Sequence, residues 1–174
     1  MKKKFFQNLI KNFIRFIFKI IHGHILILRN DNKLEIVSKN ISQIKINDKI
    51  YKINNSIYEI SNGRVYTDNV ENVAYIKDTF LIPKISFQQI DGEFKDLESN
   101  KVLFQGTPRM IKKYDGTIFS LVQGVSGKNY FHFLFDILVK IKLLQEKYSL
   151  NEIDYFYISG NYEWQQKLLQ FYGI

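Results

Sequence analysis

The chain has no cysteine, and only two prolines and one tryptophan among its 174 residues. The absence of cysteine excludes a disulfide scaffold and a thiolate metal site, although by itself it names no compartment. A membrane-spanning helix needs a run of about 20 apolar residues, and no such run is present. Hydrophobic residues nevertheless make up 45% of the chain, which is enough for a packed core. The length fits one ordinary domain, or a small domain with part of another.

Acidic residues are missing from residues 1–22, which hold 6 of the 25 basic residues. The net charge of +8 is therefore concentrated at the N-terminus, because the rest of the chain has 19 basic residues against 17 acidic ones. A body so close to neutral is not expected to carry the large basic patch that binds nucleic acid.

Residues 4–22 are predicted to form an amphipathic helix. Polar residues recur at steps of three or four along one face: Lys4, Asn8, Lys11, Arg15, Lys19 and His22. Apolar residues fill the other face: Phe6, Leu9, Phe13, Ile14, Ile17, Ile20 and Ile21. A signal peptide is excluded because cations interrupt the apolar core and no small-residue cleavage site follows. The pattern favours a helix lying in a membrane interface, with cations toward anionic headgroups. The alternative is a helix packed on the body of the protein or on a partner.

Residues 23–122 are predicted to be β-rich and antiparallel. Asn/Asp/Lys turns separate short strands, which are expected at His24–Leu28, Leu34–Ser38, Ser42–Ile46, Ile50–Ile53 and Ile57–Ile60. Hairpin turns are expected at Asn62-Gly63 and Lys77-Asp78, the second joining Val73–Ile76 to Thr79–Ile82. Residues 91–108 are interpreted as a loop or hinge. The Asp115-Gly116 dipeptide predicts a further hairpin between Arg109–Tyr114 and Thr117–Val122.

Residues 123–174 change to an alternating strand and helix pattern. Asn129 is a good N-cap for a helix from Tyr130 to about Lys147. A short strand follows at Ile153–Ile158, and a second helix begins near Asn161. Units this short predict the start of a parallel α/β sheet. Two strands and two helices do not complete such a sheet, so the sequence is interpreted as a truncated lobe or a partial product.

The stretch from Gly124 to Asp136 is the strongest candidate for chemistry. The turn from Gly124 through Gly127 to Asn129 precedes a helix and could cradle an anion, although it matches neither a Walker loop nor a dinucleotide fingerprint. A plain tight turn is the alternative. His132 and Asp136 lie one helical turn apart, so the carboxylate can orient the imidazole as a general base. The alternative is a solvated stripe of His132, Asp136 and Lys140.

Ser159 and Gly160 follow the last predicted strand, where ligands bind in open α/β sheets. Trp164 is interpreted as a core residue rather than as a stacking platform. The sequence has no His/Glu/Cys cluster with metal-ligand spacing and no nucleophile elbow.

The segment Asn129-Tyr130-Phe131-His132-Phe133-Leu134-Phe135-Asp136, followed by Leu143-Leu144, resembles the signature of glycosyltransferase family 61. This family includes many bacterial capsular polysaccharide biosynthesis proteins. The segment Gln165–Gly173, which includes Leu168, is similar to a helix that commonly follows the signature in this family. The resemblance covers roughly residues 62–174, and its last third is the most specific.

The resemblance implies a Rossmann-like, GT-B-type protein that transfers a sugar from a nucleotide-sugar donor to a glycan or lipid-linked acceptor without a bound cofactor or metal. It implies catalytic roles for His132 and Asp136. From their positions before a helix and after a strand, we expect substrate contacts at Gly124, Gly127, Asn129, Ser159 and Gly160. A location at the inner face of a membrane would suit a lipid-linked acceptor. The competing hypothesis is a non-catalytic, membrane-associated binding module.

Overall fold

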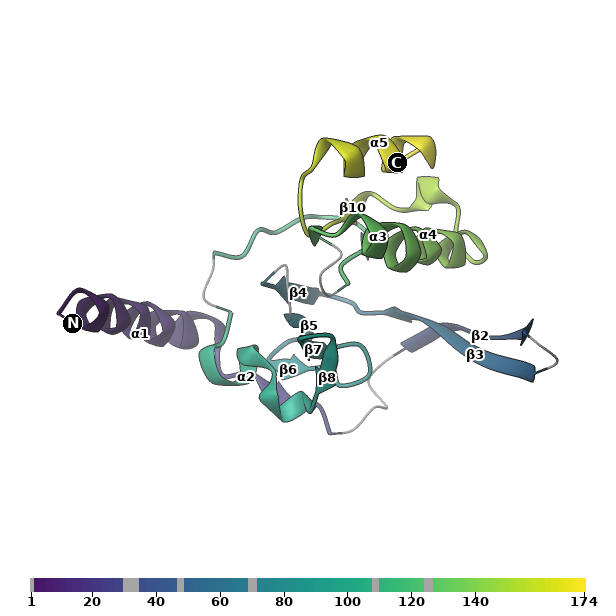
Figure 1. The fold of residues 1–174 in the computed structure, drawn as a ribbon. Helices are drawn as coiled ribbons and strands as arrows, with labels where there is room; N and C mark the ends of the chain where they lie inside the picture. Colours follow the sequence, from purple (N-terminus) through teal and green to yellow (C-terminus); the bar gives the residue numbers. More distant parts are fainter. Residues whose placement is uncertain (1, 30–34, 47–48, 69–71, 108–109, 124–126) are drawn as a thin grey trace.

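The computed structural model describes residues 2–29, 35–46, 49–68, 72–107, 110–123 and 127–174. It shows a mixed α/β protein with an N-terminal helix and a curled, mostly antiparallel sheet, as the sequence predicts at this coarse level (Figure 1). The helical elements are α1 (Lys2–His22), η2 (Leu97–Ser99), α2 (Lys101–Gln105), α3 (Tyr130–His132), η4 (Phe133–Ile137), α4 (Leu138–Gln145), η5 (Leu150–Glu152) and α5 (Glu163–Phe171). The strands are β1 (Leu26–Ile27), β2 (Glu35–Ile46), β3 (Lys49–Glu59), β4 (Gly63–Thr67), β5 (Asn72–Lys77), β6 (Phe80–Leu81), β7 (Phe87–Ile90), β8 (Glu93–Lys95), β9 (Ile118–Ser120) and β10 (Tyr155–Tyr157).

Strand β5 is the centre of the curled sheet. It pairs antiparallel with β4 along its length, with β6 near its end and with β7 near its start, while β1 adds a short parallel pair to β6. Val73, Ala74 and Ile76 on β5 are fully buried, and Val102 of α2 packs in the same core. Burial of these apolar side chains stabilises β5 as the strand that pairs with β4, β6 and β7.

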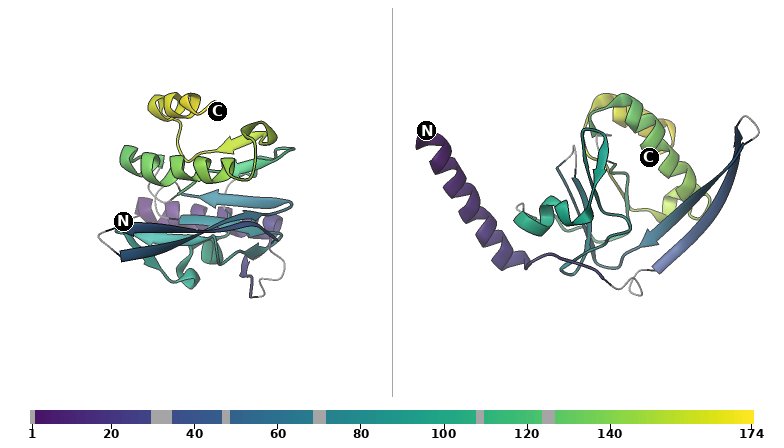
Figure 2. Two further views of the ribbon diagram at one scale, coloured as in Figure 1. Left: turned by 90° about the vertical axis from the view of Figure 1, so that its right-hand side faces the viewer. Right: turned by 60° about the horizontal axis from the view of Figure 1, so that its bottom comes forward.

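Strands β2 and β3 form a long ribbon that extends away from the sheet on the side opposite α1 (Figure 1; Figure 2). The prediction of four short strands here is wrong. Asn40 pairs with Asn55 inside the ladder, and the register shifts between Ile36 and Ser38 in the manner of a β-bulge. Asn favours turns, but strand pairing outweighs this weak local preference.

The predicted hairpin turn at Lys77-Asp78 is confirmed, whereas the hairpin at Asn62-Gly63 is wrong: the turn there connects β3 to β4, which pair with β2 and β5 rather than with each other. Both Asn62 and Asp78 have positive φ values, 54° and 55°, which Asn and Asp tolerate better than other side chains. The Asp78 turn joins β5 to β6, with Ile76 opposite Leu81. The predicted loop at residues 91–108 is wrong, because Asp91-Gly92 closes the β7–β8 hairpin and Asn100 then caps α2.

The predicted hairpin at Asp115-Gly116 is also wrong, and Arg109 lies outside the described residues. Strand β9 pairs in parallel with β10, Ile118 lying opposite Tyr155, and the described residues 110–114 form no strand. Asp154 explains the bend, because its Oδ2 accepts a hydrogen bond of 2.6 Å from the Thr117 amide. This hydrogen bond joins two residues that are 37 positions apart, and it outweighs the local preference of Asp115-Gly116 for a hairpin turn.

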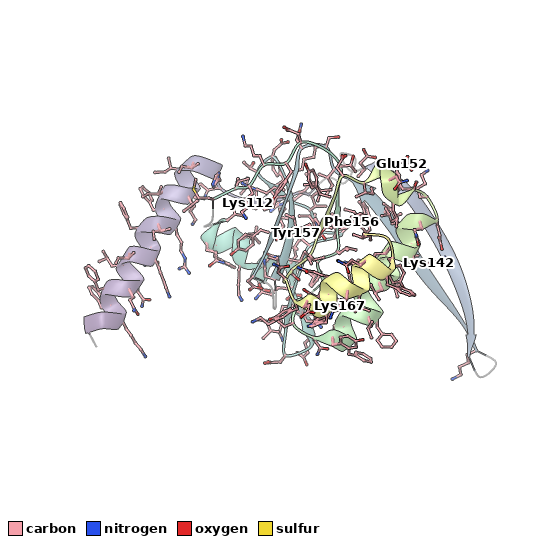
Figure 3. All side chains as sticks on the ribbon, turned by 90° about the horizontal axis from the view of Figure 1, so that it is seen from above. Lys112, Lys142, Glu152, Phe156, Tyr157 and Lys167 are labelled. Atoms are coloured by element: carbon pink, nitrogen blue, oxygen red, sulfur yellow. The ribbon has the colours of Figure 1, made fainter. Side chains whose placement is uncertain are left out.

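Between β9 and β10 the chain runs through α3, η4 and α4, and α5 follows β10, in the predicted strand–helix–strand–helix order. Buried residues of the segment after β9 and of the helices share one core: Leu121, Phe133, Ile137, Leu138, Ile141 and Leu169. Helices α4 and α5 lie on the same side of the molecule, and Figure 3 shows Lys142 and Lys167 along them. Tyr75 of β5 and Ser120 of β9 share a hydrogen bond of 2.8 Å, which ties this α/β unit to the curled sheet.

The expected domain boundaries at residues 1–22, 23–122 and 123–174 stay a prediction. Helix α1 ends at His22. Strand β9 lies before residue 122, while its partner β10 lies after it.

Candidate functional site

The site begins where the chain leaves β9 and enters the helix. Leu121 and Val122 are buried just after the strand. Gly124, an expected substrate contact, lies outside the described residues. Asn129 is the predicted N-cap, since its Oδ1 accepts a hydrogen bond of 3.3 Å from the His132 amide. Its side chain therefore fixes the first turn of the helix and the place of His132.

His132 and Asp136 form a direct contact. The imidazole Nδ1 lies 2.9 Å from Asp136 Oδ2, and the two side chains are 40% and 39% exposed. A carboxylate at Nδ1 favours the tautomer that carries its proton there, which leaves Nε2 as an acceptor. The pair is thus oriented for general-base chemistry and open to a substrate.

The helix widens into a π turn at Phe133–Ile137, immediately after His132. Such turns are rare and frequently lie at functional sites, and no sequence pattern predicts this one. One side of this helix faces solvent, where Phe131, Phe135 and Val139 are exposed. The Phe131 and Phe135 rings lie 4.4 Å apart beside the polar pair.

Lys140 does not belong to a solvated stripe. Its Nζ donates a hydrogen bond of 2.8 Å to the carbonyl oxygen of Val122. Burial lowers the pKa of Lys140 to about 8, while the charge of Asp136 acts in the opposite direction. The alternative of a uniformly solvated face is therefore wrong for Lys140. Sequence reasoning missed this residue as a member of the site, although the spacing of four from Asp136 was visible.

The loops after β9 and β10 meet at Gly127 and Ser159. A Cβ on Gly127 would overlap the Ser159 carbonyl oxygen and lie 2.6 Å from Ser159 Oγ. Gly160 has a φ of 136°, a conformation that favours glycine. Ser159 is 4% exposed, and its Oγ has no hydrogen-bond partner among the described residues. Three of the expected substrate contacts therefore lie together at the ends of two parallel strands, where ligands commonly bind.

Gln165 holds the two loops together and was not predicted. The side chain is fully buried, and its Nε2 donates to the Gly127 carbonyl oxygen at 3.3 Å. Its Oε1 accepts from the Tyr162 amide at 3.1 Å. The capping position three residues after Tyr162 was the available signal. Trp164 packs edge-on against Phe133 with ring centroids 5.2 Å apart, which confirms its interpretation as a core residue.

Helix α1 presents its apolar face outward. Ten large apolar side chains on it are exposed: Phe5, Phe6, Leu9, Ile10, Phe13, Ile14, Phe16, Ile17, Ile20 and Ile21. The half-buried side chains of α1 lie in its second half and are Arg15, Phe18, Lys19 and His22. Arg15 Nη2 donates to Gln105 Oε1 at 3.3 Å, and Lys19 lies beside Gly106. The apolar face is therefore not packed on the described body of the protein. Within the described residues, no helix is both long enough and apolar enough to cross a membrane.

The described residues contain no group of three or more His, Cys, Asp or Glu side chains that could hold a metal ion. Comparison of the chain with protein-family models, with curated proteins and with solved structures finds no match.

Proposed function

We propose that this chain is a glycosyltransferase of the family-61 type, acting in surface polysaccharide biosynthesis. It would transfer a sugar from a nucleotide-sugar donor to a glycan or lipid-linked acceptor, and its last segment would be the start of a Rossmann-like, GT-B-type lobe. The single observation that carries the proposal is the His132–Asp136 contact of 2.9 Å on the helix that follows a parallel strand. This pair is the same His and Asp on which the family resemblance rests.

In the proposed reaction His132 Nε2 accepts the proton of an acceptor hydroxyl, while Asp136 stabilises the resulting imidazolium. The hydroxyl oxygen attacks the anomeric carbon of the donor and forms the new glycosidic bond. The bond from that carbon to the phosphate oxygen breaks, and its electron pair leaves with the nucleoside diphosphate. The loops at Gly127 and Gly160 meet after β9 and β10, at the end of two parallel strands where a sugar substrate would lie.

The exposed apolar face of α1 supports a peripheral position at the inner face of a membrane. Burial of Phe and Ile side chains in the interface would stabilise this position by about 25 cal/mol per Å². A lipid-linked acceptor would then be held near the enzyme. The same face also supports the second candidate function, a non-catalytic membrane-associated binding module, because such a module needs the helix and not the polar pair.

The decisive experiment compares His132→Gln and Asp136→Asn with the matched variant His24→Gln, which alters an exposed histidine outside the site. The purified chain is incubated with a panel of nucleotide sugars and an acceptor-containing membrane extract, and nucleoside diphosphate release is measured. We expect release to fall by about 10²–10⁴-fold in His132→Gln and to be unchanged in His24→Gln. Undiminished release in His132→Gln would show that another residue is the base. No release from the unaltered protein with any donor would favour the binding module.

Sedimentation with vesicles tests the membrane position. Phe13→Ser and Ile20→Ser alter the exposed face of α1, while Phe94→Ser alters an equally exposed apolar residue on β8. We expect the two α1 variants to pellet less than the unaltered chain and Phe94→Ser to pellet equally. Equal pelleting of all four proteins would refute an interfacial role for α1.

A further inference from the structure

The end of α1 lies near the corner of the sheet where β4 pairs with β5, since a Cβ on Gly23 would lie 3.0 Å from Thr79 Cγ2 and Arg64 of β4 is opposite Ile76 of β5. Arg64 Nε, Arg64 Nη2 and His22 Nε2 are shielded from solvent, and none has a hydrogen-bond partner among the described residues. Burial lowers the pKa of His22, and the positive charge of Arg64 lowers it further, so Arg64 is near enough to act on the imidazole. Three side-chain nitrogen atoms at this corner are therefore shielded from water and lack a hydrogen-bond partner among the described residues.

The neighbourhood of these nitrogen atoms is cationic. Arg15 and Lys19 are half-buried on the same face of α1 as His22, at helical spacing. Burial lowers the pKa of Arg64, and burial followed by the Arg64 charge lowers the pKa of His22. None of the ion pairs among the described residues includes Arg64 or His22. The positive charge thus lacks a carboxylate partner in the described part of the chain.

An arrangement of this kind is costly for a protein that binds nothing there. Leaving a buried charged group without hydrogen bonds is unfavourable, and buried charges are normally paired. Nε and Nη2 are nitrogens of one guanidinium, whose planar fork matches the two oxygens of a phosphate or carboxylate. When His22 Nε2 carries the ring proton it supplies a third donor, and three donors suit the tetrahedral phosphate group better than a flat carboxylate.

We propose that Arg64 and His22 form a binding site for a phosphate group at the junction of α1 and β4, with Lys19 adding charge. The site is separate from the His132–Asp136 pair and does not depend on glycosyl transfer. The phosphate group can belong to a phospholipid headgroup or to a free phosphate ion. Ile20 and Ile21, which immediately precede His22, are 68% and 61% exposed, so acyl chains could lie beside a bound headgroup.

The test uses the full chain with Arg64→Gln, Arg64→Lys and His22→Phe, and with Arg29→Gln as the matched control at an exposed arginine. Inorganic phosphate is titrated by calorimetry. Vesicle binding is measured with phosphatidylcholine alone and with added phosphatidylglycerol. We expect Arg64→Gln to weaken phosphate binding at least about tenfold, Arg64→Lys to weaken it less, and Arg29→Gln to leave it unchanged.

The phosphate titration and the vesicle binding together distinguish a lipid headgroup from a free phosphate as the ligand. Loss of vesicle binding in Arg64→Gln together with weaker phosphate binding assigns the site to a lipid headgroup. Loss of phosphate binding with vesicle binding intact assigns it to a free phosphate. Equal binding by all variants in both measurements overturns the proposal, as does absence of phosphate and vesicle binding by the unaltered chain. If Arg64→Gln does not fold, His22→Phe against Arg29→Gln decides by the same outcomes.

Discussion

The loops that follow β9 and β10 are in close contact at Gly127 and Ser159, so we expect Gly127→Ala to destabilise the protein. The added Cβ would overlap the Ser159 carbonyl oxygen, and Ser159 Oγ and the carbonyl carbon would lie 2.6 Å and 2.9 Å away. Backbone atoms cannot rotate aside, so the loops must separate. Overpacking of this kind costs about 1–3 kcal/mol. Separation also breaks the 3.3 Å hydrogen bond from Gln165, a fully buried side chain, at a cost of about 1–3 kcal/mol.

The expected loss in the free energy of unfolding is therefore about 2–6 kcal/mol, or a decrease of about 4–24 °C in Tm for a chain of this size. Urea unfolding followed by circular dichroism measures it. Gly92→Ala is the matched control, because its Cβ meets nothing within 4 Å although its φ is 83°, so only backbone strain of about 1–2 kcal/mol is expected. If Gly127→Ala is no more destabilising than Gly92→Ala, the two loops are not in contact as described.

Three further predictions concern single side chains of the same unit. Burial lowers the pKa of Lys140 from its ordinary value of 10.5 to about 8 in the folded state, so the unfolded state binds more protons between these values and stability rises with pH. The free energy of unfolding should gain about 2 kcal/mol from pH 7 to about 9.5 relative to Lys140→Met, and parallel pH curves for the two proteins would contradict this. Asn129→Ala should cost about 1 kcal/mol in urea unfolding because it removes the helix cap, while Asn129→Asp keeps the cap and should cost less; equal losses would argue against capping. Phe133→Ala should cost about 3–5 kcal/mol and change the fluorescence of Trp164, whose ring lies 5.2 Å away. An unchanged Trp164 spectrum in that variant would mean that the two rings do not pack together.

The candidate site was predictable where its geometry is local. The spacing of His132 and Asp136 on a helix was enough to predict their contact, and Asn129 is the cap that its residue type indicates. The roles of Gln165 and Lys140 were missed because each depends on a partner far along the chain. Gln165 reaches Gly127 across 38 residues, and Lys140 reaches Val122 across 18.

The same division holds for the fold. Sequence alone determined α1, the turns at Asn62 and Asp78, and the helical segment that follows Asn129, because residues a few positions apart decide each of them. Tertiary structure decided that β9 pairs with β10 rather than forming a hairpin, and that the apolar face of α1 lies outward. The physical reason is that strand pairing and burial draw on contacts between distant parts of the chain, which outweigh a local preference worth less than about 1 kcal/mol.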